Sequence, residues 1–137
     1  MGAKRNLTLV VIAGVGVGFP LAGCGATDSE GARDAAQRLY VAYSDDDGAA
    51  ACATLSDDTR KQLVEDEQKP CPEAVLELDL SGTATVGAEA YVTEAKVETD
   101  GGDSVFLEET GDGWRVTAAG CRPAPGREAP YDCEVES

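Results

Sequence analysis

The sequence contains no histidine, and few aromatic residues: one Trp, two Phe and four Tyr among 137 residues. The absence of His excludes Ser-His-Asp and Cys-His catalysis and removes the commonest transition-metal ligand. No Cys-x-x-Cys pair occurs either, which argues against a zinc or redox site built on the cysteines. With no catalytic signature in the chain, we predict no enzyme activity and no cofactor.

Basic residues are also scarce. Eleven Lys and Arg stand against 26 Asp and Glu, which gives a net charge of −15. A charge of this sign repels the phosphates of nucleic acids and an anionic membrane surface. We therefore expect a solvated acidic exterior and no nucleic-acid partner.

The longest apolar run is too short to span a bilayer. Lys4 and Arg5 precede the uncharged, mostly apolar segment 7–19, and Pro20 follows it. The apolar core of a signal peptide has about 7–15 residues, whereas a transmembrane helix needs about 20. We predict that residues 1–23 are a signal peptide.

The residues at the end of this segment point to a lipid anchor. Leu21-Ala22-Gly23-Cys24 resembles the lipobox of bacterial lipoproteins. The resemblance implies cleavage between Gly23 and Cys24 and a diacylglyceryl thioether on Cys24. The palmitate-type acyl chains of this group would anchor the protein in the membrane. The alternative is an ordinary secretory signal followed by a structural cysteine.

Cleavage at this point would place the mature protein outside the cell. We expect it on the outer face of the cytoplasmic membrane, lipid-anchored at the cell surface. Removal of residues 1–23 leaves 9 basic against 26 acidic residues, a net charge of −17.

The remainder divides into a short segment and one domain. Residues 24–31 are small and polar, which is typical of a flexible tether. Residues 32–137 suffice for a single domain. Its first segment, 32–44, has apolar residues at three- and four-residue steps, including Leu39 and Tyr43, and predicts an amphipathic helix.

Helical patterns continue to residue 78 and then give way to alternation. Turn and capping residues at 45–48 and 56–58, and Pro72 in a first helical turn, predict three short helices at 49–55, 59–67 and 73–78. Strands are predicted at 83–86, 90–99, 104–110 and 114–118, with hairpin loops at 100–103 and 111–113. Helices first and an antiparallel meander after them indicate an α+β fold.

The last predicted strand carries the most apolar face of the sheet. Trp114, Val116 and Ala118 alternate with polar residues. We expect this face to pack against the first helix through Leu39 and Tyr43, because that helix is the only long amphipathic one.

Four cysteines remain once Cys24 is set aside. Thiols oxidise outside the cell, so an even number predicts two disulfides, with three pairings open. Their clustering along the chain favours Cys52–Cys71 and Cys121–Cys133.

Parts of the mature chain resemble a known family. The segments 35–51, 105–121 (with Gly-Asp-Gly-Trp-Arg-Val) and 130–133 are similar to small secreted actinobacterial lipoproteins with a nuclear-transport-factor-2-like (cystatin-like) domain. The resemblance implies N-terminal helices packed in the concavity of a curved antiparallel sheet, a cone that can hold a small molecule.

Two classes of function follow from these observations. The first is a membrane-anchored extracytoplasmic lipoprotein that binds a small-molecule ligand or an envelope protein. The second is a small-molecule enzyme that uses the cone pocket. The lack of His, of a Cys nucleophile and of metal motifs favours the first class.

Overall fold

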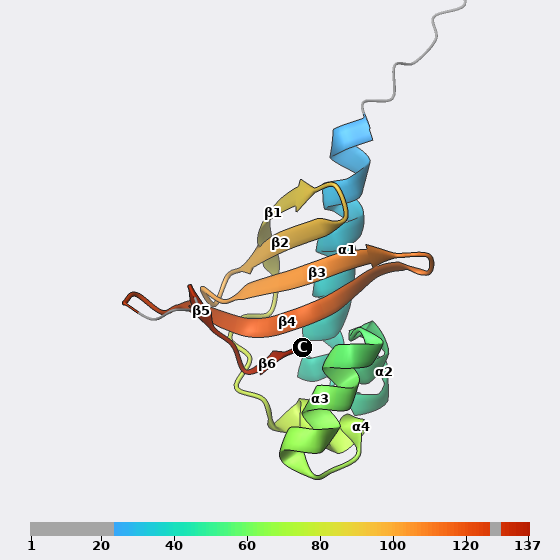
Figure 1. Ribbon diagram of the computed structural model, residues 1–137, viewed down its shortest axis with the longest axis vertical. Coiled ribbons are helices and arrows are strands. Elements are labelled where there is room, and N and C mark those ends of the chain that lie inside the picture. Colours follow the sequence, from blue (N-terminus) through green and yellow to red (C-terminus); the bar gives the residue numbers. More distant parts are fainter. Residues whose placement is uncertain (1–23, 127–129) are drawn as a thin grey trace, which may run out of the picture.

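The computed structural model describes residues 24–126 and 130–137 as an α+β fold (Figure 1). The helices come first in the sequence: α1 (Cys24–Ser44), α2 (Gly48–Thr54), α3 (Asp57–Glu67), α4 (Cys71–Ala74) and the 3-10 turn η1 (Val75–Glu77). The strands follow: β1 (Thr85–Tyr91), β2 (Glu94–Thr99), β3 (Ser104–Thr110), β4 (Gly113–Pro123), β5 (Tyr131–Asp132) and β6 (Val135–Glu136). The predicted order of helices and then strands is confirmed. The predicted signal peptide, Gly23 included, lies outside the described residues.

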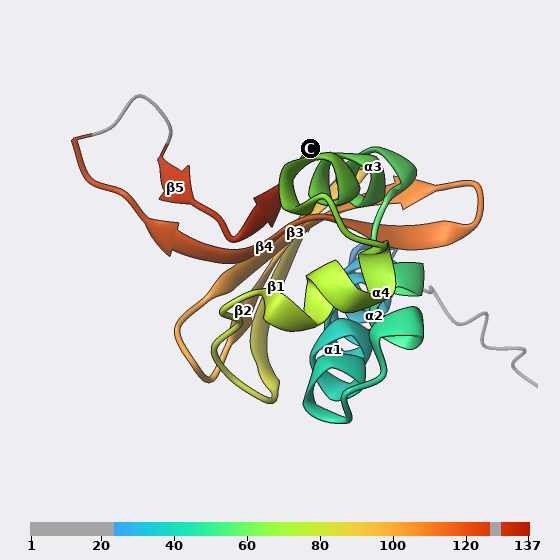
Figure 2. The same cartoon turned by 90° about the horizontal axis from the view of Figure 1, so that it is seen from below.

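The strands form one antiparallel sheet in which β1 to β5 pair in their order along the chain. The order is β1-β2-β3-β4-β5, and β6 also pairs with β4. α1 lies along one face of this sheet and contacts β1 to β4, while α2, α3 and α4 gather near the carboxyl end of α1 (Figures 1 and 2). The core lies between α1 and the sheet, where Leu39, Val97, Val105, Leu107 and Val116 are buried.

α1 begins earlier than predicted. It starts at Cys24, so the segment 24–31, predicted as a flexible tether, is helical. No proline interrupts this segment. Gly31 also lies against Trp114, because a Cβ at Gly31 would be 3.0 Å from Cδ1 of the indole. The helix can therefore include residues before the predicted start at residue 32 without a clash with the indole.

The predicted strand 90–99 is in fact the end of β1, a turn and β2. The chain reverses at Val92 and Thr93, which separates β1 from β2. Val92 has φ +56° and is 89 % exposed. A β-branched residue rarely adopts this conformation, and none of the usual turn residues occupies positions 92 and 93. The alternation of apolar and polar residues therefore gave no sign of the turn.

β4 contains an irregularity that changes which residues face the core. Phe106 pairs with Ala118 but Leu107 pairs with Val116, which leaves Thr117 as an extra residue. Such a bulge shifts the alternation by one position. Trp114 and Val116 therefore join the main core as predicted, but Ala119 replaces Ala118 there.

Ala118 thus departs from the predicted packing of α1 on β4, whereas Tyr43 is half-buried against the main core. Ala118 is buried, but it lines a surface pocket with Phe106 and Tyr131. Tyr43 donates a hydrogen bond to the Leu78 carbonyl at 2.5 Å. It stands 12 positions after Gly31, about 18 Å along the helix axis from the residue that contacts Trp114.

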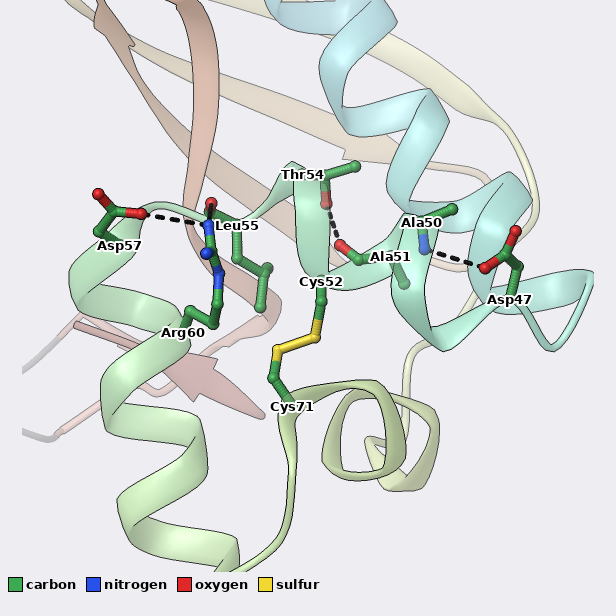
Figure 3. The surroundings of a disulfide bond; sticks show 9 residues. All are labelled: Asp47, Ala50, Ala51, Cys52, Thr54, Leu55, Asp57, Arg60 and Cys71. Carbon is green, nitrogen blue, oxygen red and sulfur yellow. Dashed lines mark hydrogen bonds and ion pairs between the residues drawn. A yellow bond between two sulfur atoms is a disulfide. The ribbon is translucent and has the colours of Figure 1, made fainter.

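Both predicted disulfides are confirmed. Cys52–Cys71 joins α2 to α4 (Figure 3), and Cys121–Cys133 holds the carboxyl-terminal segment against β4. Each closes a short loop and, in the chain-entropy description, stabilises the domain by about 3 kcal/mol. Cys133 thereby ties residues 130–137 to β4.

Candidate ligand-binding groove

A groove opens between α1, α2 and the beginning of β4. Its volume is about 490 Å³, within the range of roughly 300–1,000 Å³ of small-molecule sites. The lining residues are Ala35, Gln37, Arg38, Val41, Ala42, Asp45, Asp47, Ala50, Ala53, Thr54, Trp114 and Arg115.

Small side chains at helical spacing create the hollow. Ala35 and Ala42 lie seven residues apart on α1, and Ala50 and Ala53 lie three apart on α2, so each pair shares one helix face. Methyl groups fill little of the space between two neighbouring helices. Val41 is 48 % exposed beside them, which leaves an apolar wall open to solvent.

The position of α2 is fixed at both of its ends. At the start, the Asp47 side chain accepts a hydrogen bond from the Ala50 amide at 2.9 Å (Figure 3), as the predicted cap requires. At the other end, Leu55 forms a bridge to Val116, and the Ser56 amide donates to the Val116 carbonyl at 2.8 Å. Together with Cys52–Cys71, these bonds preform the groove.

Trp114 closes one end of the groove. Its side chain is only 7 % exposed, and it packs over the glycine face of α1 at Gly31. The adjacent Arg115 points the other way in the strand alternation and is half-buried at the rim. The apolar part of a ligand in the groove would therefore contact the indole.

Charged residues line the groove beside its apolar wall. Arg115 follows Trp114 in β4, Arg38 lies on α1, and Asp45 and Asp47 belong to the connection between α1 and α2. The groove thus carries both cationic and anionic groups. Sequence reasoning did not identify this site, although the apolar Val41 on the otherwise polar face of the first helix was a visible signal for it.

A second polar cluster lies within the domain, near the β2–β3 turn. Asp103 is 1 % exposed; it accepts a hydrogen bond from the Ser81 amide at 2.6 Å and lies 3.2 Å from Nε of Arg122. Burial raises the pKa of the Tyr40 phenol well above its ordinary value, and the Asp103 carboxylate adds to that rise. Tyr40 is fully buried and its hydroxyl has no hydrogen-bond partner among the described residues, whereas the ion pair of Asp103 with Arg122 ties the β2–β3 turn to β4.

The sequence-predicted site residues are brought together only in part. Cys24 is the first residue of α1, and the four other cysteines form the two disulfides. Among residues 24–126 and 130–137, no group of three or more Cys, Asp or Glu could hold a metal ion. The acidic run Asp45 to Asp47 acts as a turn and helix cap.

In the described part of the chain, no helix is long and apolar enough to cross a membrane.

Comparisons with known proteins add no relative to these observations. No family model, no curated protein and no solved structure matches the chain, so the resemblance to the nuclear-transport-factor-2-like lipoproteins stays a prediction.

Proposed function

We propose that the mature chain is a lipid-anchored lipoprotein on the outer face of the cytoplasmic membrane, and that its domain binds a small molecule in the groove between α1, α2 and β4. The groove is the observation that carries the binding role, because it combines an apolar wall, an aromatic end and a few charged rim residues. The signal segment and the box ending at Cys24 support the anchor. The two disulfides agree with an oxidising compartment.

We further propose that the domain is a variant of the cystatin-like cone. A helix lying along one face of an antiparallel sheet supports this assignment. The space between helix and sheet is occupied by Leu39, Val105 and Val116, which are fully buried. Binding in this variant takes place on the outer side of α1, and an enzyme that uses the inner pocket is the less favoured alternative.

The anchor is tested by changing the acylated residue. Cys24→Ala should abolish labelling of the protein with radioactive palmitate and shift it from the detergent phase to the aqueous phase on phase separation. Two acyl chains suffice for stable membrane attachment, so their loss should release or mislocalise nearly all of the protein. Cys52→Ala, which removes a disulfide instead, should leave labelling intact. Wild-type protein that carries no lipid mass on Cys24 would show that the anchor is wrong.

The groove is tested with anilinonaphthalene sulfonate, a probe with an apolar body and one anionic group. Because Trp114 is the only Trp in the chain and lines the groove, bound probe should quench its emission by energy transfer. The measurement uses the acylated protein in phosphatidylcholine vesicles, which contribute no tryptophan signal.

Two variants on α2 make this test specific for the groove. Ala53→Glu places a carboxylate among the lining residues and should reduce quenching at least severalfold. Ala49→Glu adds the same charge to an exposed position of α2 that does not line the groove, and should bind the probe as the wild type does. Equal quenching in both variants would place the probe elsewhere and contradict the proposed site.

A further inference from the structure

The cations of this acidic chain are almost all engaged by other groups. The structure describes eight Lys and Arg residues. Five form ion pairs: Arg60 with Asp57, Lys61 with Glu65, Lys69 with Glu77, Lys96 with Glu98 and Arg122 with Asp103. A sixth, Arg33, donates a hydrogen bond to the Val86 carbonyl at 3.2 Å.

The remaining two of these eight are Arg38 and Arg115, and both line the groove. Each has a carboxylate neighbour: Asp34 lies one turn before Arg38, and Glu108 is the cross-strand partner of Arg115. Neither arginine forms an ion pair within 4.0 Å. Two arginines without an ion pair, one from α1 and one from β4, therefore line the same apolar groove, in a chain that has an excess of acids.

The rest of the groove limits what these arginines could bind. Ala35 to Ala42 is a rise of seven residues, about 10 Å along α1, and Asp45 follows the end of that helix. The apolar wall is formed by Val41, Ala42, Ala50 and Ala53. Asp45 and Asp47 in the α1–α2 connection would repel a second anionic group there, so they favour a ligand with a single negative charge, held by the arginines.

We propose that the groove binds a single-chain amphiphile with one carboxylate head. The head lies between Arg38 and Arg115, and the alkyl chain runs along the alanine wall from Trp114 toward the α1–α2 connection. Guanidinium groups match carboxylate oxygens with paired hydrogen bonds, and the membrane that holds the proposed anchor is a source of such molecules. This inference rests on the groove being the binding site of the proposed function.

The test is a titration of decanoate into the acylated protein in phosphatidylcholine vesicles, followed by the emission of Trp114. Decanoate should saturate the emission change. Arg38→Gln and Arg115→Gln should each raise the dissociation constant about tenfold, because each removes a charge-assisted hydrogen bond to the carboxylate head. Lys61→Gln removes one cation outside the groove and should leave the dissociation constant unchanged.

Ligands of the same length test the head and the orientation separately. Decanol lacks the charge and decanedioate carries a second carboxylate, so both should bind at least about tenfold more weakly than decanoate. Equal binding of decanol would overturn the role of the arginines, equal binding of decanedioate would overturn the assigned orientation, and tighter binding of decyl phosphate would overturn the choice of a carboxylate head.

The probe experiment separates failure of this inference from failure of the proposed function. If decanoate gives no saturable change while anilinonaphthalene sulfonate still quenches Trp114 and Ala53→Glu still reduces that quenching, the ligand class is wrong and the binding site remains. If neither molecule binds, both proposals are wrong. Unchanged melting temperatures of the two arginine variants would show that weaker binding does not reflect unfolding.

Discussion

Replacement of Trp114 by Ala should lower the free energy of unfolding by about 3–5 kcal/mol. The indole is 7 % exposed, belongs to the main core and packs over Gly31. Removing it takes away its apolar contacts and leaves a cavity between α1 and β4 that the surrounding backbone fills only in part. Because a domain of this size is stable by only about 5–15 kcal/mol, this single loss is a large fraction of the total.

The measurement is chemical denaturation followed by circular dichroism, with the disulfides intact and again after reduction. Each disulfide constrains the unfolded chain, so the reduced variant should lose much of its folded population. Arg115→Ala is the matched control, because Arg115 is adjacent to Trp114 in the strand and makes no ion pair. Its effect on the free energy of unfolding should be below about 0.5 kcal/mol. Equal losses for the two variants, or native emission of Trp114 at the wavelength of exposed indole, would contradict the packing of β4 on α1.

Gly48→Ala should be the second most damaging of these substitutions, although it adds a single methyl group. A Cβ at Gly48 would lie 1.9 Å from the carbonyl oxygen of Pro72 and 2.7 Å from its carbonyl carbon. The clash is between two backbones, so no side-chain rotation relieves it. Overpacking of this kind costs about 1–3 kcal/mol and occasionally more, and we expect the upper part of that range.

The disulfide Cys52–Cys71 makes the clash at Gly48 harder to relieve. One half-cystine lies four residues after Gly48 and the other directly precedes Pro72, so α2 and α4 cannot separate freely. Gly111→Ala is the control, because a Cβ there meets no atom within 4 Å. A shift in the denaturation midpoint as small for Gly48→Ala as for Gly111→Ala would show that α2 and α4 are not in close contact.

Much of the fold followed from signals that act over a few residues. Helix caps at Asp47 and Ser56 and the loop at 100–103 are local features, and the structure has them where they were predicted. The turn at Val92 and the bulge at Thr117 depend on tertiary packing that overrides the local preference of the residues, so alternation alone placed Ala118 on the wrong face. Both errors arise where the backbone departs from regular geometry.

The groove was harder to predict because it depends on distant segments. Ala35 and Arg38 resemble ordinary positions of an amphipathic helix, and Arg115 resembles an ordinary outward residue of a strand. Their common location follows from the packing of α1 on β4, and the pairing of Leu55 with Val116 adds α2 beside β4. By contrast, the disulfides were predictable because each joins cysteines that are near in sequence, 19 and 12 residues apart.

Because α1 starts at Cys24, the direction in which the groove faces is fixed relative to the proposed anchor. With acyl chains on Cys24, an unbroken helix connects the membrane surface to the groove wall, and each residue of a helix turns by about 100°. One residue added within 25–31 would rotate the groove to another side of the anchor. Seven added residues would bring its direction back to within about 20° of the original and move it about 10 Å farther from the membrane. The number of residues in this short segment thus sets an angle as well as a height.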